Sequence, residues 1–264
     1  MKTMIALSLL SFSSASFATN IDLSSWSADT YNLTGGQTAG NWTLSNSNQT
    51  VTQTINADPS VYLNNLNQTN YSMDGSWKVG TSSDDDFIGF VFGYQNDHQY
   101  YVMDWKQRNQ SASTYGYADA GFRILKIDAL SRSALTVADF WDADLNSTNS
   151  TVLASNAGTG WADNTTYRFH LDFFTNPGEI SILVQNDAKT DTLWDVTIND
   201  LSYTSGQFGF YNFSQQQVQY SGFTQTGGEI VPPNAVPVPA AALLFAPALL
   251  GFISLRRKAK QAVA

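Results

Sequence analysis

The fold is decided by two neighbouring apolar segments, Asp84-Asp85-Asp86-Phe87-Ile88-Gly89-Phe90-Val91-Phe92-Gly93-Tyr94-Gln95 and Tyr100-Tyr101-Val102-Met103-Asp104-Trp105-Lys106-Gln107. Both are rich in aromatic and β-branched residues, which favour strands over helices. Polar residues that are common in turns lie between them. We therefore predict one strand over residues 87–94 and another over 99–105.

Similar short runs recur between turn clusters along residues 19–226. They cover residues 50–55, 73–79, 122–127, 167–174, 180–185, 192–198, 208–213 and 218–223. In 167–174, Tyr167, Phe169, Leu171 and Phe173 fall on one face, whereas the run at 122–127 alternates less regularly. About ten strands of this kind predict an all-β fold, a two-sheet antiparallel sandwich or jelly roll. One short helix is expected between Ser131 and Phe140.

The composition agrees with a β fold, because only 13% of the residues are charged while 13% are aromatic. A protein of long helices would need more Glu, Lys, Leu and Ala. The chain has no cysteine, which excludes thiol catalysis and cysteine-ligated zinc.

The charge is strongly segregated along the chain. Five of the 13 basic residues lie near the two ends, so residues 19–235 carry 8 basic residues against all 22 acidic ones. Such an acidic body repels phosphate backbones, which argues against nucleic acid as a partner. Only Glu179 and Glu229 are glutamates; the other acids are Asp, which suits both loops and hard cations such as calcium.

The N-terminus has the features of a Sec signal peptide. Lys2 provides a positive start, a short apolar run follows at 5–10, and Ser16-Phe17-Ala18 fits a small-x-small cleavage site. We predict a signal peptide over residues 1–18 and export of the remaining chain.

The C-terminus contains twenty uncharged residues, 236–255, which is long enough to cross a bilayer as a helix. The basic cluster that follows predicts a cytoplasmic C-terminus. This stretch and the cluster after it contain Val236, Pro237, Pro239, Ala240, Arg256, Arg257 and Lys258. This pattern resembles the PEP-CTERM sorting signal, although Val238 replaces the glutamate of the motif name.

The resemblance to PEP-CTERM implies that an exosortase-type enzyme recognises and cleaves the tail, so the protein is anchored in the inner membrane only in transit. It is then either released or re-attached at the surface. We therefore expect a signal peptide at 1–18, one β-sandwich domain at 19–226, a Gly- and Pro-containing linker at 227–235 and the sorting signal with its transmembrane helix at 236–260.

The opening segments belong to a longer set of landmarks. Gly160-Trp161, Tyr167-Arg168-Phe169-His170-Leu171 and Gly206-Gln207-Phe208-Gly209-Phe210-Tyr211-Asn212-Phe213-Ser214-Gln215 follow in order. Together they resemble the thrombospondin C-terminal domain, which implies a concanavalin A-like (legume-lectin-like) jelly roll that binds calcium. The Asp repeats and the stabilising cysteine of thrombospondins have no counterpart here, so the resemblance implies the fold and one calcium site rather than a whole cell-binding assembly.

Three consecutive carboxylates, Asp84, Asp85 and Asp86, repel one another unless a cation neutralises them or water screens them. Calcium takes six to eight oxygen ligands, so these residues are the candidate calcium ligands, with Asp119 or Asp142 as further candidates. The alternative is that the three side chains simply point into water at the start of a strand.

Aromatic residues form a second candidate site, since rings pack on the apolar faces of sugars. Tyr100, Tyr101, Trp105, Tyr115, Tyr117 and Trp141 are the candidates. The alternative is that most of them fill the core, as we expect for Trp105 and Trp161.

Evidence for an enzyme is weak. The two histidines, His98 and His170, lie in separate strand regions, and the chain has no Gly-x-Ser-x-Gly elbow and no phosphate-cradling Gly-rich loop. The Glu-x-Asp-x-x-Glu pattern of lectin-like glycosidases is also absent. We expect a non-catalytic, calcium-stabilised domain of the extracellular matrix, of biofilm or of adhesion, whose partner is either extracellular polysaccharide or another surface protein. The alternatives are a structural matrix protein without a ligand and a polysaccharide hydrolase.

Overall fold

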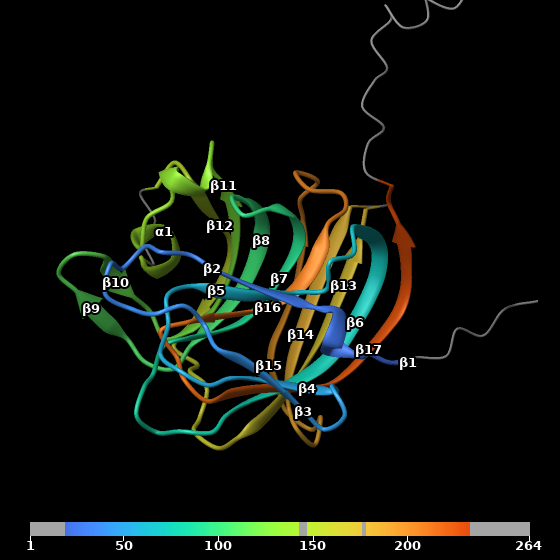
Figure 1. The fold of residues 1–264 in the computed structure, drawn as a ribbon, viewed down its shortest axis with the longest axis horizontal. Coiled ribbons are helices and arrows are strands. Elements are labelled where there is room, and N and C mark those ends of the chain that lie inside the picture. Colours follow the sequence, from blue (N-terminus) through green and yellow to red (C-terminus); the bar gives the residue numbers. More distant parts are fainter. Residues whose placement is uncertain (1–18, 143–146, 176–177, 233–264) are drawn as a thin grey trace, which may run out of the picture. The chain divides into compact units, whose positions relative to one another are not determined.

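The computed structural model describes residues 19–142, 147–175 and 178–232, and the regular structure within them is almost entirely β-strand (Figure 1). The strands form two packed antiparallel sheets, which confirms the predicted all-β sandwich. In this part of the chain, no helix is both long and apolar enough to cross a membrane. The predicted signal peptide and sorting signal lie outside the described residues.

Eight of the described strands form the first sheet. They are β1 (Thr19–Asn20), β3 (Trp42–Ser45), β4 (Thr50–Gln53), β6 (Gln68–Val79), β13 (Thr166–Phe174), β14 (Glu179–Asn186), β15 (Thr192–Asn199) and β17 (Val218–Ile230). Their order is β15-β14-β13-β6-β17-β4-β3, with β1 paired to β17. β17 pairs with β6 as far as Ile230, so it continues four residues past position 226, where the sequence predicts the domain to end.

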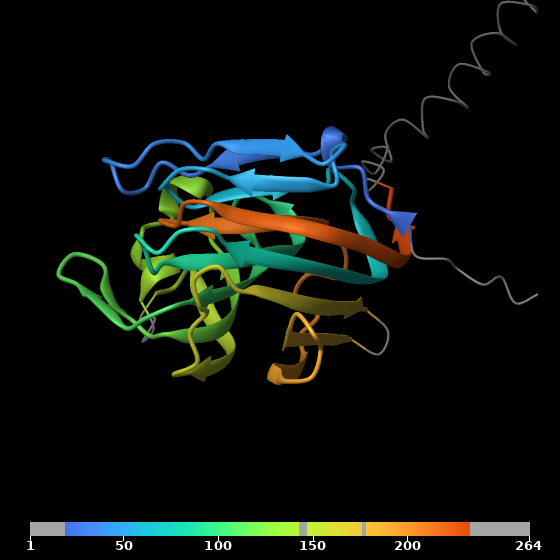
Figure 2. The same cartoon turned by 90° about the horizontal axis from the view of Figure 1, so that it is seen from below.

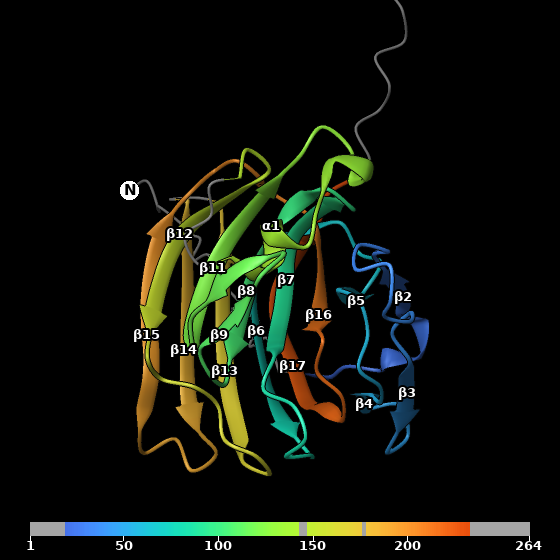
Figure 3. The same cartoon turned by 90° about the vertical axis from the view of Figure 1, so that its left-hand side faces the viewer.

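The second sheet has seven of the described strands. They are β2 (Ser27–Thr30), β5 (Ser60–Leu63), β7 (Phe87–Asn96), β8 (Gln99–Lys106), β11 (Gly121–Asp128), β12 (Ser150–Ala157) and β16 (Gln207–Phe213). Their order is β12-β11-β8-β7-β16-β5-β2, and Figure 3 shows this layer lying against the first sheet.

A two-stranded hairpin, β9 (Gln110–Ala112) with β10 (Gly116–Ala118), projects from the sandwich between β8 and β11 (Figures 1 and 2). Helical structure among the described residues is limited to two 3₁₀ turns, Leu23–Ser25 and Arg132–Ala134, and the single-turn helix α1 (Ala138–Trp141). The short helix expected between Ser131 and Phe140 is therefore only partly present, because the chain is extended at Leu135.

Aromatic rings from both sheets fill the space between them. Phe90 on β7 lies 4.7 Å from Phe169 on β13, and Phe169 stacks on Trp77 of β6 at 4.9 Å between ring centroids. The outward positions of β13 are only half-buried, as its alternating sequence predicts. Burial of these large rings is the main source of the sandwich's stability.

The second sheet is buried on its outer face as well. A cover of irregular chain, which includes Tyr31, Val137 and α1, packs there. This explains why the first eight residues of β7 are all buried, and why β11 lacks clean alternation: Phe122 and Ile124 face the first sheet, whereas Leu125 and Ile127 face the cover. The outer cover also positions the candidate site.

Candidate metal site

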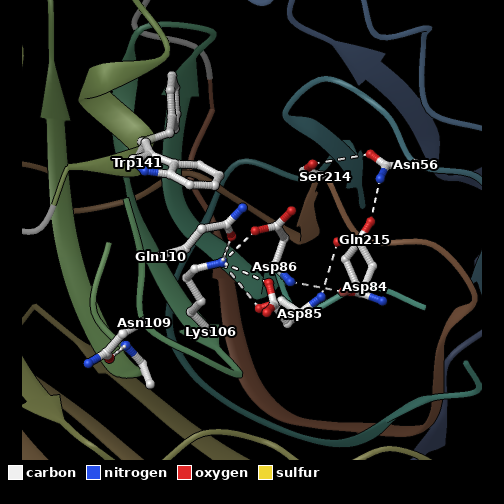
Figure 4. A network of polar contacts seen from close by, with 12 residues as sticks. Asn56, Asp84, Asp85, Asp86, Lys106, Asn109, Gln110, Trp141, Ser214 and Gln215 are labelled. Carbon is white, nitrogen blue, oxygen red and sulfur yellow. Dashed lines mark hydrogen bonds and ion pairs between the residues drawn. The ribbon is translucent and has the colours of Figure 1, made fainter. Parts of the chain in front are cut away.

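The three acidic residues singled out in the sequence lie together where the chain enters β7. Asp84 and Asp85 are half-buried, and Asp86 is almost fully buried. Each of the three offers a carboxylate oxygen, and these oxygens lie within 4.8 Å of one another. The group faces the end of β8 and the chain that follows β16 (Figure 4).

Asp86 is held on all sides by side chains of distant segments. Its backbone N–H donates to Oε1 of the buried Gln215 at 3.0 Å, and its carbonyl oxygen accepts from Nε1 of Trp161 at 3.1 Å. Its carboxylate accepts a hydrogen bond from the ammonium of Lys106. These contacts fix the last of the three acids as part of the folded core.

Lys106 is the residue of the site that the sequence analysis missed. Its side chain is completely buried, and its Nζ lies 3.2 Å from the carbonyl oxygen and 3.5 Å from Oδ1 of Asp85. The ammonium also lies about 5 Å from the ring centroids of Phe87 and Trp141, which stabilises a desolvated cation. One buried positive charge therefore faces three carboxylates.

Asp84 carries the uncompensated charge. Burial, followed by the negative charge of Asp86, raises the pKa of Asp84 to about 6. Its carboxylate accepts hydrogen bonds from the Asn56 amide and, at 3.1 Å, from the backbone N–H of Asp85. These two donors only partly offset the repulsion from Asp86.

This arrangement fits a hard divalent cation such as calcium. Asp84 and Asp85 offer carboxylate oxygens that are still partly open to solvent, while Lys106 engages one oxygen of Asp86. A cation here would offset both the burial and the repulsion from Asp86 that raise the pKa of Asp84.

Asp119 and Asp142 do not belong to this group. Among the described residues, the acidic cluster contains only Asp84, Asp85 and Asp86. Asp119 lines a shallow recess beside β11 and β12, and Asp142 lies against Gly116 of the β9–β10 hairpin. Neither residue is placed as an additional ligand.

The candidate aromatic residues divide sharply by exposure. Tyr100, Tyr101, Trp105 and Trp141 are buried, so for these four the core alternative is right, and Trp161 is buried as expected. Tyr115 is half-buried and Tyr117 is 40% exposed. Both of these lie on the β9–β10 hairpin, which is therefore where the candidate aromatic rings reach the surface.

The two histidines are engaged in separate polar contacts. Nδ1 of His98 lies 2.8 Å from Oδ1 of Asp97. His170, on β13, lies between Asp74 and Asp172, at 2.9 Å and 3.1 Å, and these contacts raise its pKa. Both ring nitrogens of His170 therefore already have carboxylate partners.

Comparison with known families gives a match over most of the chain. The family described as the thrombospondin C-terminal region matches residues 37–227. The chain belongs to this family. Thrombospondin-2 of Bos taurus is 29% identical over 187 residues, which cover 69% of this chain and 16% of that protein. Thrombospondin-3a of Danio rerio is 28% identical over 202 residues, which cover 73% and 20%. This thrombospondin C-terminal chain thus spans about a fifth or less of these relatives.

Solved structures show the same lectin-like fold at low sequence identity. The exoplasmic/lumenal domain of VIP36, in a Ca²⁺/Man3GlcNAc-bound form, has a TM-score of 0.51 at 10% identity and covers 81% of this chain and 86% of that one. Lectin II from Ulex europaeus also has a TM-score of 0.51, at 8% identity, and covers 81% and 98%. At this identity the likeness concerns the fold alone.

Proposed function

We propose that this chain is an exported, non-catalytic, calcium-stabilised, lectin-like protein that binds glycan in the extracellular matrix, in biofilm or in adhesion. The observation that carries the proposal is the uncompensated charge of Asp84–Asp86 beside Lys106, within a member of the thrombospondin C-terminal region family. The calcium- and mannose-containing VIP36 neighbour supports it by analogy of fold.

Calcium has a structural role in this proposal. Asp84, Asp85 and the second oxygen of Asp86 would hold it, and the ion would supply the positive charge that Lys106 alone does not. Because the site joins β7 to the ends of β8 and β16, an ion there would stabilise the second sheet.

The absence of catalysis is supported by how the titratable groups are used. His170 and Lys106 are paired with carboxylates, and Glu179 and Glu229 lie exposed at strand positions. Asp84, the half-buried acid whose pKa is raised, belongs to the proposed calcium site. A lectin-like glycosidase needs two carboxylates that flank a scissile bond, one of them with a raised pKa. A matrix polysaccharide hydrolase is therefore the weaker alternative.

The route to the surface is proposed from the sequence of the two ends. A signal peptide at 1–18 would export the domain, and an exosortase-type enzyme would recognise Val236, Pro237, Pro239 and Ala240 together with the cluster at 256–258. Mass spectrometry of the mature protein, with and without the exosortase gene, should show loss of the tail only when the gene is present. An intact tail in both strains would contradict the sorting proposal and would favour a plain membrane anchor.

A pull-down separates the proposed function from its alternatives. The full chain is incubated with the extracellular polysaccharide of the cells that produce it, in calcium and in excess EDTA. We expect retention that EDTA abolishes. No retention in calcium would favour a structural matrix protein without a ligand, and release of reducing sugar would favour a hydrolase.

A further inference from the structure

A groove on the outer cover is separate from the acidic cluster. It lies between the chain at Asn32–Leu33, the turn of the β9–β10 hairpin at Thr114–Tyr115, and the segment Leu135–Ala138 that leads into α1. The hairpin and α1 lie side by side in Figure 1. Three segments that are distant in sequence thus form one surface.

The lining of this groove contains no charged residue. Leu33, Ala138 and the ring of Tyr115 supply apolar surface, while Asn32 and Thr114 supply polar groups. No hydrogen bond among the described residues uses the side chains of Asn32, Thr114 or Tyr115. Their donors and acceptors are therefore available to a ligand.

The Tyr115 ring is held in place before any ligand arrives. Its backbone N–H donates to the carbonyl of Ala112 at 3.1 Å, which closes the hairpin turn, and its ring lies edge-on to Trp141 with centroids 6.3 Å apart. The next residue, Gly116, has φ of +99°, and a Cβ there would lie 2.6 Å from the carboxyl carbon of Asp142. A fixed ring loses little entropy on binding, which favours affinity.

We propose that this groove binds an uncharged polysaccharide chain, with Tyr115 against the apolar face of one sugar and with Asn32 and Thr114 bonded to sugar hydroxyls. The inference rests on the glycan-binding function proposed above and adds the place and the charge class of the ligand. Sugar rings match an aromatic face flanked by amide and hydroxyl groups. An anionic chain would be repelled by a body with 8 basic and 22 acidic residues, and the lining offers no cation to hold it.

The test measures binding of the full chain to soluble neutral polysaccharides, a β-glucan, a mannan and a galactan, with alginate as the anionic comparison. Tyr115→Ala and Asn32→Ala remove groove contacts, and Tyr115→Phe keeps the ring. Tyr117→Ala is the matched control, because Tyr117 is exposed on the same hairpin but does not line the groove. Melting temperatures of all variants check that each one folds.

We expect at least one neutral polysaccharide to bind, with Tyr115→Ala weakening the affinity tenfold or more and Tyr117→Ala changing it less than twofold. If the wild type binds but Tyr115→Ala and Asn32→Ala bind equally well, the groove is wrong while the glycan function stands. If no polysaccharide binds, both the proposed groove and the proposed glycan-binding function are wrong. Binding of alginate alone, or groove-dependent capture of a peptide array instead of glycan, also overturns the inference.

Discussion

The ammonium of Lys106 lies against the carboxylate of Asp86, and both side chains are removed from water. The rings of Phe87 and Trp141, which pack edge to face, each have their centroid about 5 Å from the ammonium. The pair joins the start of β7 to the end of β8, and through Gln110, at 2.9 Å from Nζ, it also reaches the base of the β9–β10 hairpin. The acidic cluster and the hairpin thus share one buried cation.

Removal of that cation should destabilise the fold strongly. Lys106→Met leaves the buried carboxylate of Asp86 without its partner, which costs about 3–5 kcal/mol of unfolding free energy. The double variant Lys106→Met with Asp86→Leu should lose less than the sum of the two single variants, because neither charge is then left alone. Denaturant unfolding of all four proteins measures this.

An exposed ion pair provides the control. Arg168 and Asp187 lie 2.8 Å apart with side chains 42% and 56% exposed, so Arg168→Met should cost no more than about 1 kcal/mol. Equal losses for Lys106→Met and Arg168→Met would contradict the buried-pair interpretation.

Phe90 is the second position at which a single change should have a large effect. Its ring is fully buried between the sheets, and its centroid lies 4.7 Å from that of Phe169 and 5.7 Å from that of Phe208. Phe90→Ala should cost about 3–5 kcal/mol, since the cavity cannot close on rings from two sheets. Thermal or denaturant unfolding tests this against Tyr117→Ala, for which we expect about 0.5 kcal/mol or less. A small loss at Phe90 would mean that the sheets are not packed through this ring.

His170 should give the fold a measurable dependence on pH. Its hydrogen bond to Asp74, reinforced by Asp172, raises its pKa in the folded state, so the charged form is favoured by folding. This stability is fully present below the unfolded pKa of about 6.5 and is lost as the pH rises through the higher folded value.

The measurement is the midpoint of urea unfolding at about pH 6 and about pH 9. The wild type should lose more stability over this interval than His170→Gln does, and Asp74→Asn should fall between them. The other charged groups beside this site, Arg168 and Lys189, remain in all three proteins. An identical pH dependence for wild type and His170→Gln would refute the assignment of this pH dependence to His170.

The sequence was sufficient to predict the long strands and the fold class. Each of the ten predicted strands coincides with an observed strand, because their apolar periodicity comes from burial between the sheets. It was not sufficient for β1, β2, β3, β5, β9, β10 or β12. Most of these have only three or four residues, and β12 is a largely half-exposed edge strand with a polar sequence, so pairing with neighbours rather than local preference makes them strands.

Only the acidic residues of the site were predictable from the sequence. The three adjacent aspartates are evident in the sequence. The position of their partner Lys106, however, depends on the register of β7 with β8. If the pairing of Asn96 with Gln99 continued unbroken, Lys106 would lie opposite Gly89, whereas the observed irregularity between Phe92 and Asn96 places it opposite Phe87. That bulge, with Gly93 at φ of +56°, moves the ammonium next to Asp86 and is not evident from strand propensity.

Calcium should raise the melting temperature of the full chain. The matched variant is Asp84→Asn with Asp85→Asn, which removes two partly solvated carboxylates and leaves the Lys106–Asp86 pair intact. The more drastic Asp85→Ala with Asp86→Ala would also abolish the effect, but it leaves Lys106 without its partner. In EDTA, Asp84→Asn alone should be at least as stable as the wild type near neutral pH, because it removes the cost of burying this charge and its repulsion from Asp86, which together raise the pKa of Asp84. A lower melting temperature for Asp84→Asn under these conditions would show that this repulsion is already balanced.

The most direct test of the account is a calorimetric titration of calcium into the EDTA-stripped full chain and into the variant Asp84→Asn with Asp85→Asn. The account predicts saturable binding of calcium by the wild type, with magnesium much weaker, and no binding at this site by the variant. No calcium binding by the wild type, or equal binding by both proteins, would contradict it.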